Sequence, residues 1–149
     1  MSDTGISAFD STLHTTNIWL NDLLDRMGWV DKHRAYHAFR VVFHALRDRL
    51  PVDQAAALGA QLPMLVRGFY FEGWHPGDKP VKERRKDEFL AHIRQAFPDD
   101  PDIDPEEVAR AVFQVIAKHV SPGEIKHVKI TLPHELRSLW TPELHSAWF

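Results

Sequence analysis

The stretch 61–70 reads QLPMLVRGFY, and the stretch 131–140 reads TLPHELRSLW. In both, Leu-Pro leads, an arginine follows the proline by four residues, and an aromatic residue closes the segment. The two prolines lie seventy positions apart, and so do Arg67 and Arg137. Recurrence at a fixed offset is the signature of an internal repeat, so the stretch indicates a duplicated architecture.

The same offset continues upstream without a gap. It pairs Arg40 with Arg110, and most of the other matched positions are apolar in both copies. A burial pattern is therefore what repeats. We expect two tandem copies of a helical motif, at about 19–70 and 89–140. The alternative is two unrelated helical segments that share a similar period.

Helical spacing of apolar residues runs through most of the chain, and strand-like alternation is nearly absent. Asp31 and Asp104 stand where they can cap helices, Gly28 where it can end one, and Pro63 where a first-turn proline fits. Helices are expected at about 17–27, 32–49, 53–60, from 63, 83–97, from 105 and from 122, with a last short turn at 141–143. This predicts an all-α orthogonal bundle of about eight helices, whose halves are joined by a loop at 71–82.

Length and composition favour a single domain, 1–149, with 44% hydrophobic and 26% charged residues. The net charge of −3 argues against a dedicated nucleic-acid binder. A basic run at 79–86 is interleaved with acids, which favours an exposed helix start over a phosphate site. Cysteine is absent, and neither a secretory signal nor a membrane-spanning run is present. We therefore expect a cytoplasmic protein without membrane contact.

Three histidines fall on one stripe of the helix predicted at 32–49. His33 and His37 are four residues apart, and His44 follows seven residues later. Such spacing can hold a transition metal between successive turns. No acidic residue shares the stripe, which is predicted to face away from the core. A solvated polar face is the favoured interpretation, and a metal site is the alternative.

The repeated arginines are the strongest candidates for ligand binding. Arg67 and Arg137 each follow a proline by one turn, and Arg40 and Arg110 repeat in the same way. Guanidinium groups bind carboxylate or phosphate in a bidentate manner, so these four could form an anion site at a cleft between the halves. In the alternative interpretation, which is favoured, each arginine lays its stem on the core and binds backbone carbonyls at a helix end.

Several motifs resemble those of a bacterial family known as a domain of unknown function, number 2267. They are the run LPMLVRGFYFEGWHPGDKP, the following RRKDEFL, and the terminal LPHELRSLW. The resemblance covers roughly residues 15–142. It implies an all-α fold in bacterial proteins, but no established activity, substrate or cofactor, so no catalytic residue is carried over.

No sequence motif for a nucleophile, a metal or a phosphate site is present. We therefore predict a non-catalytic protein-binding or regulatory module without a cofactor, with a protein partner or a homo-oligomer as the expected assembly. The aromatic pair Trp148–Phe149 either covers the bundle or forms a partner surface. The alternative function is a small-anion or metabolite binder, with enzymatic activity left open.

Overall fold

Helices alone make up the regular structure of residues 3–140, the part of the chain that this computed structural model describes. The α-helices are α1 (Ser7–Met27), α2 (Lys32–Asp48), α3 (Val52–Ala60), α4 (Met64–Phe71), α5 (Lys86–Gln95), α6 (Pro105–His119) and α7 (Pro122–Thr131), and the 3₁₀-helices are η1 (Pro76–Asp78) and η2 (His134–Leu139). The predicted all-α bundle of about eight helices is confirmed. None of the helices described is long and apolar enough to cross a membrane. The predicted turn at 141–143 and the pair Trp148–Phe149 lie outside the described residues.

Local capping signals end and begin several helices where the sequence predicts. The Asp31 side chain accepts a hydrogen bond from the backbone N–H of His33 at 2.9 Å, which starts α2. Asp104 accepts from the backbone of Glu106 at 3.0 Å in the same way, which starts α6. Gly28 ends α1 with a φ of 68°, a left-handed conformation that glycine adopts without steric cost.

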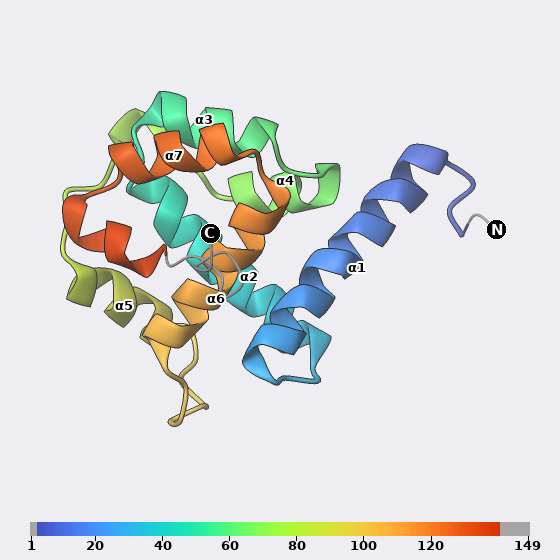
Figure 1. The fold of residues 1–149 in the computed structure, drawn as a ribbon, viewed down its shortest axis with the longest axis horizontal. Coiled ribbons are helices and arrows are strands. Elements are labelled where there is room, and N and C mark those ends of the chain that lie inside the picture. The colour runs from blue at the N-terminus through green and yellow to red at the C-terminus, as the bar shows by residue number, and fades with distance from the viewer. Residues whose placement is uncertain (1–2, 141–149) are drawn as a thin grey trace, which may run out of the picture.

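The start of α1 differs from the prediction by ten residues, because the helix begins at Ser7 and not at residue 17. Five of the ten residues 7–16 are Ser or Thr, which are weak helix formers, and this composition hid the helix. In Figure 1 the N-terminal half of α1 projects from the bundle as an arm. Thr12 connects this arm to α4, because its hydroxyl accepts a hydrogen bond from the backbone N–H of Leu65 at 2.9 Å.

Two other helix starts also differ from the prediction. Helix α5 begins at Lys86, because the Glu83 carboxylate pairs with Arg49 and the Glu88 carboxylate accepts the backbone N–H of Arg85. Pro63 occupies the N-cap of α4, one position before the predicted first turn. The ion-paired Glu83 thus lies just before α5, and Pro63 lies just before α4.

The core surrounds α2, which packs against α1, α4, α5 and α6 (Figure 1). Trp19 of α1 contacts Phe39 and Phe43 of α2, with ring centroids 6.2 and 6.5 Å away. In the second half, Phe113 of α6 stacks on Trp140 at 4.2 Å. The buried apolar side chains of both halves form one contiguous cluster, so the helices share a single interior.

Candidate functional site

Arg67 and Arg137 each bind the end of the preceding helix. The Arg67 guanidinium donates to the carbonyls of Gly59 at 3.1 Å, Ala60 at 3.4 Å and Leu62 at 2.9 Å, near the C-terminus of α3. Arg137 donates to the carbonyl of Ile130 at 2.7 Å, in the last turn of α7. Carbonyls at a helix C-terminus have no intrahelical donor, so both arginines satisfy groups that the fold leaves open.

Arg40 and Arg110 each pair with a different acid. Arg40 pairs with Glu72 and lies over the ring of Tyr36, 5.8 Å from its centroid. Arg110 pairs with Glu106 at 2.8 Å and also donates to the backbone carbonyl of Ser138 at 2.8 Å. Arg110 and Arg137 line separate hollows in the described surface, so the structure does not gather the predicted arginines in one cleft.

In the predicted histidine stripe, His37 and His44 are half-buried against other helix ends, whereas His33 is exposed. Nε2 of His37 lies 2.6 Å from the carbonyl oxygen of Ala96, and Nε2 of His44 lies 2.6 Å from that of Phe69. A carbonyl only accepts, so each Nε2 carries its hydrogen and offers no lone pair to a metal. His33 lies with His37 on a shallow hollow near the end of α5. Across residues 3–140, no three His, Cys, Asp or Glu side chains are grouped as metal ligands.

Burial lowers the pKa of His44. Its pKa lies below the ordinary value because desolvation disfavours the charged ring, and nearby Arg47 and Arg40 lower it further. The hydrogen bond to Phe69 and the charge of Asp48 act in the opposite direction without reversing the shift. His44 is therefore a neutral donor within the fold at neutral pH.

Two buried arginines, Arg47 and Arg49, were not predicted from the sequence to have a structural or functional role. Arg47 is 4% exposed and donates to the carbonyls of Tyr70 and Glu72, which fixes the end of α4 against α2. Arg49 is 3% exposed, donates to the carbonyl of Ala45 and pairs with Glu83. The available signal was their position in the chain, because Arg47 follows the fully buried Leu46 and Arg49 precedes the fully buried Leu50.

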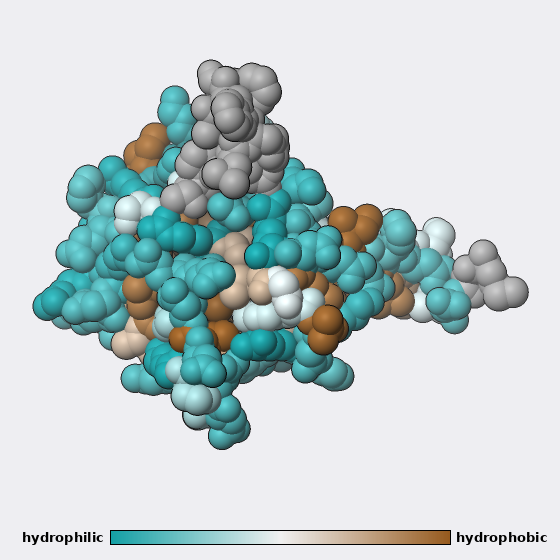
Figure 2. All heavy atoms as spheres, turned by 60° about the horizontal axis from the view of Figure 1, so that its bottom comes forward, coloured by the Kyte–Doolittle hydropathy of each residue, from teal (hydrophilic) through white to brown (hydrophobic). Residues whose placement is uncertain are grey.

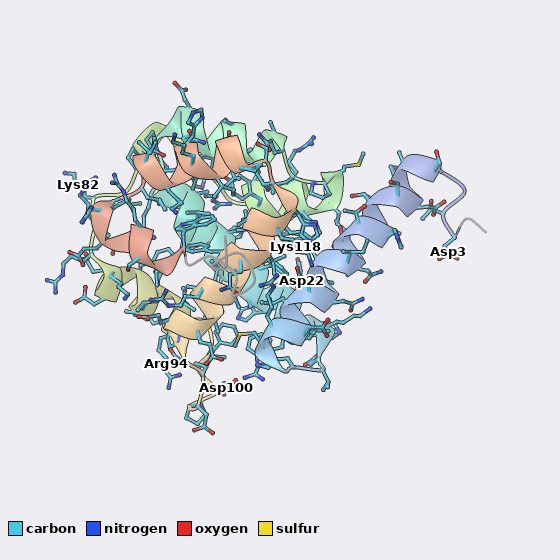
Figure 3. All side chains as sticks on the ribbon, in the orientation of Figure 1. Asp3, Asp22, Lys82, Arg94, Asp100 and Lys118 are labelled. Carbon is cyan, nitrogen blue, oxygen red and sulfur yellow. The ribbon has the colours of Figure 1, made fainter. Side chains whose placement is uncertain are left out.

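A polar cluster joins α1 to α6, where Figure 3 labels Asp22 beside Lys118. The Asp22 carboxylate accepts from Arg26 at 2.8 Å and lies 3.5 Å from Nε2 of His119 and 3.9 Å from Nζ of Lys118. The imidazole of His119 stacks on Trp19 with centroids 5.0 Å apart. Desolvation lowers the pKa of His119 more than Asp22 raises it, so the ring is neutral at neutral pH.

An apolar hollow of about 480 Å³ opens between the end of α6, α7 and η2. Ile125 and Ile130 form part of its wall, and Lys126, Lys129 and Arg137 bring positive charge to it. Within the described residues, neither lysine forms an ion pair with a carboxylate. The combination of apolar wall and unbalanced positive charge suits a ligand that carries an apolar group and an anion.

The arm of α1 carries a row of exposed apolar side chains. Ile6, Phe9 and Leu13 lie on one face at successive turns and are 49%, 46% and 41% exposed. Figure 2 shows hydrophobic atoms recurring along the projecting arm. We call these three side chains the open seam. Contiguous exposed apolar side chains are typical of a surface that binds another macromolecule.

The stripe on which the open seam lies continues into the bundle. Thr16 and Leu20 follow on the same face, and with Leu65 and Phe69 they line an open hollow of about 440 Å³ at the root of the arm. Leu23 follows in turn and is fully buried in the core. One stripe of α1 is thus partnered at its C-terminal end and unpartnered at its N-terminal end.

These features define an all-α protein with one shared core and a projecting first helix. The family model DUF2267, described as an uncharacterized conserved protein, matches residues 16–139, and the chain belongs to that family. The resemblance seen in the sequence motifs is thereby confirmed. A comparison with curated proteins found no match. The matched region begins after the open seam.

Proposed function

We propose that this chain is a non-catalytic protein-binding module, with the open seam as its binding surface. The observation that carries the proposal is the exposure of Ile6, Phe9 and Leu13 along one face of a projecting helix. An amphipathic helix binds proteins by laying its apolar face against a groove or another helix, with anchors spaced by three and four residues. The open seam has that spacing.

The composition of the arm supports the same function. Residues 7–21 contain one Asp and no Glu, Lys or Arg, although charged residues make up 26% of the chain. Depletion of charge, together with aromatic and aliphatic anchors, distinguishes the buried centre of an interface from other surface. A helix that served only as a solvated extension would carry more charge.

Size separation of native extract tests the proposal. The tagged full chain should elute in an assembly larger than its 17.2 kDa monomer. The Leu13→Asp variant should elute later, because an acid in the seam opposes burial. Ile18→Asp is the matched control, since Ile18 lies on the same helix, is 43% exposed and points away from the seam. Equal behaviour of wild type and Leu13→Asp would contradict the proposal.

A second candidate function is binding of a small organic anion in the hollow between α7 and η2. The supporting observation is the positive charge of Lys126, Lys129 and Arg137 around an apolar wall. This differs from the expected cleft between halves, because Arg137 is the only one of the four predicted arginines that contributes. Aliphatic carboxylates should raise the melting temperature of wild type more than that of Lys129→Ala. Equal shifts would exclude the hollow.

We also propose that the single domain arose by duplication. Helices α3 and α7 begin seventy positions apart, and so do α4 and η2. Helix α1 packs on α2 as α5 packs on α6, and α4 packs on α2 as η2 packs on α6. Superposing 19–70 on 89–140 in an experimentally determined structure tests the proposal. A match limited to one pair of helices would contradict it. The cytoplasmic setting, the bacterial origin and the expectation that nucleic acid is not a partner stay predictions.

A further inference from the structure

We infer that the partner of the open seam is the same segment of a second copy of this chain, paired antiparallel about a two-fold axis near Leu13. This inference rests on the proposed function and specifies its partner. Three features of the molecule support it: the spacing of the apolar residues along the seam, the position of the hollow beside it, and the charge of the flanking residues.

The spacing of the apolar residues along the seam is typical of a helix that packs against another helix. The open seam is the N-terminal part of a longer stripe on α1 and its N-cap. The members of this stripe recur at alternating steps of three and four residues: Ile6, Phe9, Leu13, Thr16, Leu20, Leu23 and Met27. Alternation of this kind is the heptad pattern of helices that pack along their length. The C-terminal members contact the core, whereas Ile6, Phe9 and Leu13 extend the same line beyond the bundle. A second helix laid along the arm would continue the packing that the bundle begins.

The surface is complementary to itself. Thr16 and Leu20 follow the open seam on the same stripe and line the hollow at the root of the arm, so the exposed ridge and the hollow occupy the same face of α1. In an antiparallel pair centred on Leu13, Ile6 of one copy faces Leu20 of the other, because both lie seven residues from the centre. The tip of each arm then meets the hollow of its partner. A two-fold contact requires this kind of self-complementary patch.

The residues that flank the seam carry little charge, so two identical copies of this helix can pair without strong repulsion. Positions beside a heptad seam set partner choice through their charges, and identical charged helices repel. Here those positions hold Thr12 and Asn17, which are uncharged, and one acid, Asp10. The Asp10 carboxylate accepts hydrogen bonds from the backbone and hydroxyl of Thr4, at 3.0 and 2.8 Å. Self-pairing therefore adds a single carboxylate per copy.

Light scattering during size exclusion of the purified full chain tests the inference. Wild type should have twice the monomer mass of 17.2 kDa. Leu13→Asp should weaken association by at least about 100-fold, since both copies place an acid at the centre of the contact. Ile18→Asp should remain dimeric. Circular dichroism and urea unfolding at a concentration where both variants are monomeric should match, because the substituted positions lie outside the core.

Cross-linking locates the axis. The chain has no cysteine, so one introduced thiol reports on self-contact alone. Leu13→Cys should form disulfide-linked dimers with oxidised glutathione as the oxidant, because the two thiols would lie near the axis. Ile18→Cys should remain largely reduced. Equal cross-linking of the two variants would overturn the antiparallel arrangement.

The outcomes separate this inference from the proposed function. A purified wild type that stays at 17.2 kDa at high concentration overturns self-pairing. If the extract still contains a larger assembly that Leu13→Asp abolishes, the open seam binds a different protein and the proposed function survives. If neither preparation contains an assembly that depends on Leu13, both fail.

Discussion

Gln54 and Glu124 hydrogen-bond to one another across the contact between α3 and α7. Seventy positions separate them, which is the offset of the repeated sequence pattern. In a two-fold arrangement a residue meets its own counterpart only beside the axis. The pair thus lies where the axis relating two duplicated halves would pass, which supports the proposed duplication.

The Gln54–Glu124 pair provides a charge test. Gln54→Glu places two carboxylates together at a site where Glu124 is 9% exposed, and it should lower the free energy of unfolding by about 1–3 kcal/mol at pH 7. Gln54→Glu combined with Glu124→Gln restores one amide and one carboxylate, and it should recover most of the loss. Urea unfolding measures both. A double variant as unstable as the single one would contradict the pairing.

Gly59 should not tolerate a side chain. A Cβ built on Gly59 would lie 2.3 Å from Cζ of Phe71, closer than unbonded carbon atoms approach. Gly59→Ala should therefore destabilise the fold by about 1–3 kcal/mol, despite the better helix propensity of alanine.

The matched control is Gly68→Ala in α4, where an added Cβ meets no atom within 4 Å. That change should stabilise the protein by about 0.5–1 kcal/mol. Thermal unfolding should separate the two variants in opposite directions, and equal melting temperatures would show that Phe71 does not pack on α3.

Acid should weaken the fold through His44 and His119. Both have pKa values below the ordinary 6.5 in the folded state, so below pH 6.5 the unfolded chain binds protons more readily than the folded chain. Their contribution to stability is complete above pH 6.5 and is lost as pH falls through the folded pKa values. Urea unfolding at pH 7.5 and pH 5.5 measures the loss. His44→Gln keeps a donor for Phe69 and should reduce the pH dependence; an unchanged dependence would exclude His44 as a source.

Removal of the helix-end arginines should have unequal effects. Arg67→Ala loses donors to three carbonyls and should cost about 1.5–3 kcal/mol, whereas Arg137→Ala loses one and should cost about 0.5–1.5 kcal/mol. Chemical denaturation of both variants gives the comparison. A reversed order, or stabilisation by either substitution, would contradict a fastening role at α3 and α7.

Sequence predicts those features of this protein that local chemistry determines. Asp31, Asp104 and Gly28 act on backbone groups within a few residues, so their positions alone indicate helix ends. The early start of α1 was not predicted because Ser and Thr weaken the local helical signal. The apolar residues Ile6 and Leu13 indicate a helix only when they are aligned with the apolar stripe of the rest of α1.

The candidate site depends on packing between distant segments and is harder to predict. The spacing of Arg67 and Arg137 allows both an anion clamp and a helix-end fastener, although it favours the fastener. The direction of each guanidinium decides between them, and that direction follows from where α3 and α7 end. The burial of Arg47 likewise follows from the carbonyls of Tyr70 and Glu72, which another helix brings to it.

The segment that joins α4 to α5 is attached to the C-terminal end of α2. The backbone N–H of Val81 donates to the carbonyl of Asp48 at 2.8 Å, and Glu83 pairs with Arg49 at 2.6 Å. Exchange of halves between two chains, as in domain swapping, would have to break both attachments. Molecules that associate through their arms should therefore each keep a complete hydrophobic interior of their own, and dilution should separate them without unfolding.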